Sequence, residues 1–398
     1  MNYYSEIHNL LTCFFNIEYS QDQFAWAFVS EHEIENKTRN NLELFKPKIL
    51  ERLRENNQTR LIITFATELT SAGAVENYKK LLTQNRIPLE RVHFIAITEP
   101  QKIMVQNTAP EFKVSVFNYW EYVTASMVKA WPATVETDLE HKRFLYLNRR
   151  FTETRALIYY RLCKDQQFME NSHVSMHRGS YWQGSIDHNH YRIVLRAGFC
   201  NHPEYRDLIN FYTNNPSLPK TQTEVNPQDY DFMGYENTAI VQLHKQTDLN
   251  IVVESHPTHT ADGFMPTEKT YRSIAVGQPF VVFGTPGFYG NLVNQGYRLQ
   301  IPEFDHIEDT FQRLEQFVQH VQQIAQIKKW KHYIAEQKQL TEYNRNLLYR
   351  RVAKKQIVKN FHSELVKHMN PQLPTIANFY PVAFPPQPRS GCASAKNL

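Results

Sequence analysis

Glycine is scarce in this chain of 398 residues: it occurs 12 times, and five of those glycines fall within residues 273–297. The same 25-residue segment contains no charged residue, and Pro279 and Pro286 interrupt it. Elsewhere the sequence has no run of about 18 apolar residues, which a membrane-spanning helix needs. We therefore expect residues 273–297 to form turns and closely packed backbone, and we expect no membrane span.

Cysteine is also rare, and its placement argues against a disulfide framework. The four cysteines, Cys13, Cys163, Cys200 and Cys392, are widely scattered and show neither metal-binding nor disulfide spacing. Free thiols are typical of a reducing compartment. The first residues lack a basic stretch, and residues 10–17 are too short and mixed for a signal peptide. We expect a cytoplasmic protein, with a peripheral membrane contact as the alternative left open.

Charge is unevenly distributed along the chain. The formal net charge is +4, but residues 328–367 hold eleven Lys and Arg against three Asp and Glu. That segment carries a net +8, so the rest of the chain carries about −4. Apolar residues make up 41% and aromatic residues 13% of the chain, which is enough for real cores. The length predicts more than one domain.

Alternating strand and helix patterns begin near residue 60. Residues 60–66 and 92–98 read as buried strands, and a helical stretch at 74–84 lies between them. Such a βαβ unit predicts parallel pairing. Residues 114–117 are a candidate third strand. We assign residues 1–140 to an N-terminal α/β domain.

The pattern resumes after residue 140 and predicts a second α/β domain over residues 141–327. Leu157, Ile158 and Leu162 share one face of a helix that follows the first strand. Residues 170–236 look irregular. The strands expected in this domain are 144–147, 249–253, 279–283 and 297–299, and the further helices are 268–276, 288–295 and 308–327. The fold class is therefore α/β, with two Rossmann-like domains.

The end of the chain differs from both domains. Apolar residues spaced three to seven apart within 328–370 predict one or two amphipathic helices with a basic outer face. Residues 371–398 are proline-rich and then small and polar, which is typical of a flexible tail.

An adjacent acid and base, Glu268 and Lys269, stand directly before the uncharged segment. Thr267 is a suitable N-cap, so both charges fall in the first turn of a helix that Gly277 ends. A lysine there is unfavourable for the helix alone, because the free backbone N–H groups favour anions. A bound phosphate would reverse that balance, and Glu268 could accept hydrogen bonds from a ribose diol. The alternative is a solvated first turn.

The surrounding motifs add a resemblance. The stretch Val252-Val-Glu-Ser, a short loop, Thr267-Glu-Lys, a helix and Gly277-Gln-Pro-Phe-Val-Val-Phe-Gly resembles the donor half of the fucosyltransferase-like glycosyltransferases. Asn148-Arg-Arg-x-x-x-x-Arg followed by a helix resembles the arginine element that faces the nucleotide in that family. The resemblance covers residues 144–325. The N-terminal domain shows only the general α/β pattern.

The resemblance implies the GT-B architecture, in which donor and acceptor meet between two domains. It further implies inverting, metal-independent transfer of a sugar from a nucleotide-sugar, with a GDP-sugar favoured, to a hydroxyl of a glycan or another acceptor. The N-terminal domain would hold the acceptor. No cofactor is expected, because the nucleotide-sugar is a substrate. The implied donor-binding residues are Asn148, Arg149, Arg155, Glu254, Ser255, Thr267, Glu268 and Lys269, with Lys269 and Arg155 at the diphosphate.

Arg149 and Arg150 compete with Arg155 for the phosphate role. A surface position on the helix is the alternative for Arg155.

Inverting transfer also needs a base for the acceptor hydroxyl. Glu68 and Glu99 each follow a predicted strand of the N-terminal domain and would lie at its carboxyl end. Glu68 is preferred because small polar residues surround it. For both, a solvated loop carboxylate is the alternative.

Metal-binding patterns are present but weak. Asp229-Tyr-Asp231 has the form that binds a divalent metal in the other large glycosyltransferase class, but no hydrophobic strand precedes it. His173, His177 and the pair His188 and His190 could form a zinc set, although the gap between the two pairs is unfavourable. We expect no metal, and a metal-dependent transferase using Asp229 and Asp231 stays as an alternative.

Two readings from other classes remain. A non-catalytic module for carbohydrate or nucleotide would keep the fold without turnover, but Glu268, Lys269 and an aligned arginine argue against it. A nucleic-acid binder would use residues 328–367, which lack regular aromatic interleaving, and the rest of the chain is acidic. We expect no nucleic-acid partner. For this segment, an anionic membrane surface and packing against the protein body are the two expectations.

Overall fold

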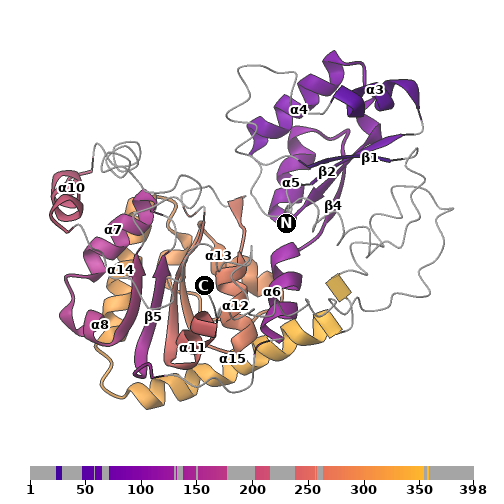
Figure 1. Ribbon diagram of the computed structural model, residues 1–398. Helices are drawn as coiled ribbons and strands as arrows, with labels where there is room; N and C mark the ends of the chain where they lie inside the picture. Colours follow the sequence, from indigo (N-terminus) through magenta and orange to yellow (C-terminus); the bar gives the residue numbers. More distant parts are fainter. Residues whose placement is uncertain are drawn as a thin grey trace, which may run out of the picture.

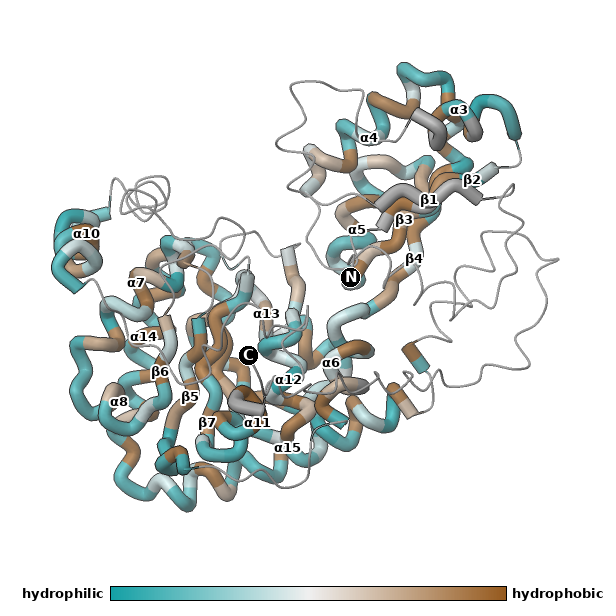
Figure 2. The backbone as a smooth tube through the Cα atoms, viewed as in Figure 1, coloured by the Kyte–Doolittle hydropathy of each residue, from teal (hydrophilic) through white to brown (hydrophobic). Residues whose placement is uncertain are grey.

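The chain folds around two parallel β-sheets (Figure 1). Figure 2 shows that hydrophobic residues are concentrated in the strands, whereas hydrophobic and hydrophilic stretches alternate along the helices around them. The computed structural model describes residues 24–28, 47–57, 59–64, 71–129, 131, 138–148, 151–176, 202–215, 238–255, 257, 263–353 and 356–357.

The first sheet has the strand order β1-β2-β3-β4, with every neighbouring pair parallel. Its strands are β1 Phe24–Phe28, β2 Arg60–Thr64, β3 Val92–Ala96 and β4 Lys113–Val116. The helices of this lobe are α3 Pro47–Glu55, α4 Ala72–Gln84 and α5 Glu99–Thr108, with the 3-10 turn η1 Leu89–Arg91. The strands predicted at 60–66, 92–98 and 114–117 and the helix at 74–84 are thereby confirmed, with bounds shifted by a few residues.

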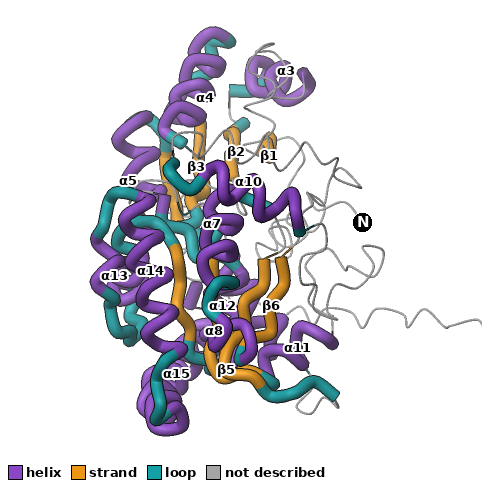
Figure 3. The backbone as a smooth tube through the Cα atoms, turned by 90° about the vertical axis from the view of Figure 1, so that its left-hand side faces the viewer, coloured by secondary structure: helices purple, strands orange, loops and turns teal. Residues whose placement is uncertain are grey.

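The second sheet has the order β6-β5-β7-β8 and is also parallel throughout. Its strands are β5 Lys142–Asn148, β6 Ser172–Met176, β7 Thr247–Val253 and β8 Phe280–Phe283. The helices around it are α7 Glu153–Leu162, α8 Gln166–Glu170, α10 Tyr205–Asn214, α11 Thr238–Lys245, α12 Glu268–Val276, α13 Phe288–Asn294 and α14 Thr310–Ala325, with the 3-10 turn η4 Glu303–His306. Helices therefore flank the strands, as Figure 3 shows from the side, and the two Rossmann-like α/β units expected from the sequence are confirmed.

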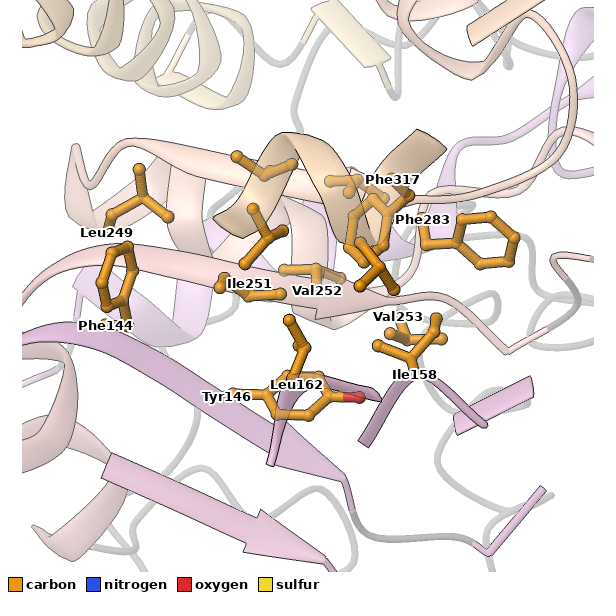
Figure 4. Close-up of a cluster of buried hydrophobic side chains, with 14 of the residues drawn as sticks. Phe144, Tyr146, Ile158, Leu162, Leu249, Ile251, Val252, Val253, Phe283 and Phe317 are labelled. Carbon is orange, nitrogen blue, oxygen red and sulfur yellow. The ribbon is translucent and has the colours of Figure 1, made fainter. Parts of the chain in front are cut away.

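Buried strands explain why the second sheet reads as continuous apolar runs in the sequence. Ile251, Val252 and Val253 are all nearly inaccessible, because helices cover both faces of a parallel sheet. On one face Phe283 packs against Phe317 of α14, with ring centroids 5.3 Å apart. Figure 4 shows this core between β5, β7 and the surrounding helices.

Two expectations for the second domain are wrong. Residues 297–299 do not form a strand: the backbone N–H and carbonyl of Arg298 bond to the side chain of Asn344, at 2.7 and 2.8 Å. Residues 170–236 are not irregular throughout, since they contain β6 and α10. The sequence of β6, Ser-His-Val-Ser-Met, has little apolar character because it is an edge strand.

Two helices bind the lobes together. α6, Tyr119–Lys129, follows the last strand of the first sheet, yet it packs against α12 and α15. Ala125 and Val128 of α6 belong to the core of the second sheet. α15, Trp330–Ala353, runs along the base of the second lobe and ends beneath α6 (Figure 1).

The packing of α15 supports one of the two expectations for the basic segment. Its buried positions, among them Trp330, Ile334 and Leu348, face the protein body. The apolar positions that a lipid-binding helix would present are thus already used within the described part of this helix. A contact with an anionic membrane surface is not supported. Among the residues described, no helix is long and apolar enough to cross a membrane.

Replacing Asn344 by alanine should loosen this helix. Both backbone groups of Arg298 would lose a part-buried hydrogen bond, and a typical bond contributes about 0.5–1.5 kcal/mol, or about 1–3 kcal/mol for the two. We expect the free energy of unfolding in urea to fall by that amount. The control is Asn346→Ala, an exposed position on the same helix. Equal stabilities for the two variants would contradict the role given to α15.

Candidate functional site

A buried carboxylate joins the end of β7 to the start of α12. Glu254, which directly follows the strand, is 3% exposed. Its Oε1 accepts hydrogen bonds from the Thr267 backbone N–H at 3.0 Å and from Thr270 Oγ1 at 2.6 Å, and its Oε2 accepts one from Thr267 Oγ1 at 2.6 Å. Charge-assisted bonds of this kind are the strong ones. Glu254 therefore holds the first turn of α12 at the carboxyl edge of the sheet.

The limits of α12 follow from its capping residues, as the sequence predicts. Thr267 is the N-cap, and Gly277 ends the helix with a left-handed φ of 79°. Glycine adopts that conformation without steric cost. Within the helix, Ser273 Oγ accepts a hydrogen bond from Asn250 Nδ2 of β7 at 2.8 Å. The helix is thus fixed to the strand at two levels.

Lys269 points back to the end of the strand. Its Nζ lies 3.0 Å from Glu268 Oε1, 3.1 Å from Thr267 Oγ1 and 3.3 Å from Ser255 Oγ. The Lys269 and Glu268 side chains each keep 23% of their surface accessible. The ammonium is therefore held in one place at the helix N-terminus and is still reachable from solvent.

The Glu268 carboxylate is held ionised by its neighbours. Burial opposes ionisation, but Lys269 and Arg272 outweigh that effect and lower the pKa of Glu268 to about 2. Glu268 thus carries its full charge at neutral pH. The structure therefore places a lysine at a helix N-terminus with an ionised carboxylate beside it, as the sequence predicts.

Arg155 lies on the same edge but is buried. It is 3% exposed, and its Nη2 donates to the carbonyl oxygens of Val253 at 3.0 Å and Glu254 at 3.5 Å. These bonds tie α7 to the end of β7, so the structure gives Arg155 a positioning role. Its assignment as a second phosphate contact stays a prediction. The alternative from the sequence, a position on the surface of the helix, is wrong because Arg155 is buried.

Asn148, the last residue of β5, is 1% exposed. Its amide lies beside the hydroxyl of Tyr146. Burial raises the pKa of Tyr146, and the nearby Asn148 and Arg155 act in the opposite direction and lower it in part. Neither amide atom makes a hydrogen bond of good geometry to the described part of the chain. Asn148 thus retains hydrogen-bonding capacity at the carboxyl edge. Its donor-binding role stays a prediction.

The carboxyl edge of the first sheet meets this region. Thr98, two residues after β3, donates from Oγ1 to the carbonyl oxygen of Phe264 at 3.0 Å. Ile97 and Met265 form a small apolar cluster with Trp120 packed against it. The segment that leads into Thr267 is thus in contact with the other lobe. The two Rossmann-like units therefore meet at their carboxyl edges, as the GT-B architecture implied by the resemblance requires.

Sequence reasoning overlooked Thr98 and Thr270, although both had local signals. Thr98 begins Thr-Glu-Pro-Gln, a capping pattern in which Gln101 N–H donates to Thr98 Oγ1 at 3.4 Å and Gln101 Oε1 accepts from Ile97 N–H at 2.6 Å. Thr270 stands one helical turn after Thr267, on the face of α12 that meets Glu254.

A second helix N-terminus on this edge is already occupied. The side chain of Asp305 accepts from the backbone N–H groups of Tyr289 at 2.9 Å and Gly290 at 3.2 Å, in the first turn of α13. Burial raises the pKa of Asp305, and these backbone bonds work against that rise. The carboxylate takes the place that an external anion would use, which leaves α12 as the better candidate.

Several predicted residues lie outside the described part of the chain: Glu68, Arg149, Arg150, Asp229, Asp231, His177, His188 and His190. Glu99, the second candidate base, is described. Its side chain is 64% exposed and lies 3.6 Å from Lys102 Nζ, which agrees with a solvated carboxylate. His173 Nε2 lies 2.8 Å from the Glu140 carbonyl oxygen. Among described residues, no group of three or more His, Cys, Asp or Glu could hold a metal.

Comparisons with known proteins give little beyond the fold. No protein-family model and no curated protein matches the sequence. A structure named trehalose-6-phosphate from E. coli, bound with UDP-2-fluoro glucose, is 12% identical with a TM-score of 0.47, covering 92% of this chain and 77% of that one. An alpha,alpha-trehalose 6-phosphate synthase from Burkholderia multivorans is 10% identical with a TM-score of 0.48, covering 93% and 77%. Likenesses this distant bear on neither substrate nor chemistry.

The ion pair predicts a pH-dependent stability. Because the pKa of Glu268 falls from 4.5 to about 2 on folding, its ionised form stabilises the fold above pH 4.5, and that contribution is lost as pH falls toward 2. We expect Glu268→Gln to be less stable than the unmodified protein near neutral pH, with the difference shrinking between pH 4.5 and pH 2.

Urea unfolding at a series of pH values measures this difference, with the exposed Glu342→Gln on α15 as the control. A Glu268→Gln difference that stays constant across that range would show that Lys269 does not hold the carboxylate ionised.

Proposed function

We propose that this protein is a glycosyltransferase that uses a nucleotide-sugar donor and transfers the sugar to a hydroxyl group of a glycan or another acceptor. The observation that carries the proposal is the position of Lys269. It stands at the N-terminus of α12, on the carboxyl edge of the second sheet, where open α/β sheets bind ligands. The neighbouring segment contacts the carboxyl edge of the first sheet, from which an acceptor could approach.

The chemistry of the reaction requires a positive group at this place. Sugar transfer leaves a nucleoside diphosphate that carries new negative charge, and an enzyme without a metal must stabilise it with cations and helix N-termini. Lys269 is held by three oxygen atoms before any ligand binds. Its position therefore costs little reorganisation during the reaction.

Glu268 and its neighbours suit the rest of a nucleotide. The low pKa of Glu268 keeps its carboxylate ionised, and an ionised carboxylate can accept two hydrogen bonds from a ribose diol. Asn148 offers a further amide at the neighbouring strand end. Ser255 lies beside Lys269 and would meet the same phosphate groups.

The finer features of the proposal rest on the resemblance to the fucosyltransferase-like family. They are a preference for a GDP-sugar, inversion at the anomeric carbon, and independence of metal, with Glu68 as the base. A metal-dependent transferase that uses Asp229 and Asp231 is the alternative within the same class. A non-catalytic module that binds carbohydrate or nucleotide is the alternative without turnover.

Removing the lysine charge should abolish most binding and transfer. A nucleoside diphosphate at 100 times its dissociation constant should stabilise the unmodified protein by about 2.7 kcal/mol. We expect Lys269→Met to lose most of that stabilisation, and to lose activity by about 10²–10³-fold, as when one charge-stabilising donor is removed. The measurement is a thermal-shift panel of GDP, UDP, CDP and ADP, followed by transfer assays with the matching sugar nucleotides.

The control is Lys331→Met, an exposed lysine on α15 that should leave both readouts unchanged. Near-normal transfer by Lys269→Met would overturn the site. Each assay is repeated in excess EDTA: persistent activity supports the metal-independent form, and loss that manganese restores supports Asp229 and Asp231. Diphosphate binding without transfer from any sugar nucleotide would support the non-catalytic module.

A further inference from the structure

A buried polar cluster lies where α6 meets α12 and α15. Glu121 of α6, 4% exposed, accepts hydrogen bonds from Tyr297 Oη at 2.8 Å and Arg351 Nη1 at 2.8 Å through Oε1, and from Asn118 Nδ2 at 3.0 Å through Oε2. Asn118 Nδ2 also donates to Tyr271 Oη at 2.7 Å. Four separate segments of the chain therefore converge on one carboxylate and one amide.

The two tyrosines are part of this cluster as neutral donors and acceptors. Burial raises the pKa of Tyr271 and of Tyr297 well above the ordinary value, and the nearby Glu121 raises both further. Arg351 supplies the opposite charge and also lies over the ring of Tyr297, 5.2 Å from its centroid. A buried carboxylate with an ionic partner and further donors is satisfied, so the cluster is a defined connection.

The position of Asn118 gives the cluster its significance. Asn118 precedes α6, and its Oδ1 accepts from the backbone N–H of Glu121 at 3.2 Å, so it acts as the helix cap. The residue before it, Phe117, donates its backbone N–H to the Ala96 carbonyl at the end of β3, at 2.8 Å. Phe117 and Asn118 thus connect strand β3 of the first sheet to Tyr271 of α12.

Tyr271 lies two residues after Lys269, in the first turns of α12. The N-terminal part of this helix is consequently held from two sides. Glu254 holds it to the second sheet, and Asn118 connects it to the first. The Thr98 bond to the Phe264 carbonyl adds a second link to the first sheet just ahead of the helix.

We propose that the cluster of Asn118, Glu121, Tyr271, Tyr297 and Arg351 is a positioning element that sets the orientation of the Glu268–Lys269 pair relative to the first sheet. The inference rests on the proposed function of that pair as the diphosphate-binding group. In this role Tyr271 is a positioning residue, because it acts on the ligand only through the helix it shares with Lys269.

The test compares two hydroxyl deletions, one on α12 and one on α15, that each remove a hydrogen bond between α12 and a neighbouring segment. Tyr271→Phe keeps the ring and removes the link to Asn118, near the start of α12. Tyr349→Phe is the matched control, since Tyr349 Oη of α15 donates to the Ala275 carbonyl in the last turn of α12, at 3.1 Å. Tyr271→Phe loses the buried bond to Asn118 and a part-buried bond from Tyr271 Oη to Gln295 Oε1 at 3.3 Å, whereas Tyr349→Phe loses the one bond to Ala275. A purely structural role predicts lower stability in both variants and an unchanged diphosphate affinity.

The first readout is amide hydrogen exchange along α12 in the full-length protein without ligand. We expect Tyr271→Phe to speed exchange in the first turns by roughly fivefold, the factor for loss of one buried hydrogen bond, and Tyr349→Phe to affect only the last turn. The second readout is the dissociation constant for GDP and UDP by calorimetry, which should rise several-fold in Tyr271→Phe alone.

The two readouts separate the positioning element from the proposed function. Unchanged exchange in the first turns of Tyr271→Phe overturns the positioning element. Faster exchange with unchanged diphosphate affinity overturns it as well, because the orientation of Lys269 would not depend on the cluster. If the unmodified protein binds no diphosphate, the proposed function fails, and the exchange data still decide whether the cluster fixes α12.

Discussion

The carboxylate of Glu254 is the interaction on which the arrangement of the site depends. It stands at the end of β7 and binds both the backbone N–H and the hydroxyl of Thr267, together with the hydroxyl of Thr270. A buried charge is tolerated only when hydrogen bonds compensate for its lost hydration. That requirement holds the start of α12 against the end of β7. Because Lys269 is in the first turn of α12, its position is fixed by the same contacts.

The same constraint explains why the charged pair precedes the uncharged segment. Residues 273–297 supply the remainder of α12, then β8 and α13, which are packed against the second core. The charged residues of α12, Glu268, Lys269 and Arg272, all precede that segment. Gly284 shows how close the packing behind it is, because an added Cβ there would come within 2.4 Å of the Phe288 ring.

Local patterns allowed much of this region to be predicted. Thr267 and Gly277 mark the limits of α12 by capping chemistry that depends on neighbouring residues alone, and the apolar run before Gly284 marks β8. Residues 297–299 were mistaken for a strand because their partner, Asn344, lies 46 positions away in the chain. Edge strand β6 was overlooked because its polar residues lack the pattern of a buried strand.

The roles of individual site residues were harder to predict for the same reason. Lys269 and Glu268 are recognisable as a local pair. By contrast, the buried state of Arg155 depends on carbonyl groups almost a hundred residues away, and the link from Asn118 to Tyr271 spans 153 positions. A sequence pattern indicates which side chains could bind an anion. Tertiary packing decides which of them position the others.

Binding of a nucleotide diphosphate between Lys269 and the N-terminus of α12 is the central proposal for this protein. A crystal structure of the protein with the diphosphate that stabilises it most would test this claim directly. We predict phosphate oxygens within about 3 Å of Lys269 Nζ, with the ribose beside Glu268. A diphosphate bound elsewhere, with the Glu268–Lys269 pair unchanged and facing solvent, would contradict the account.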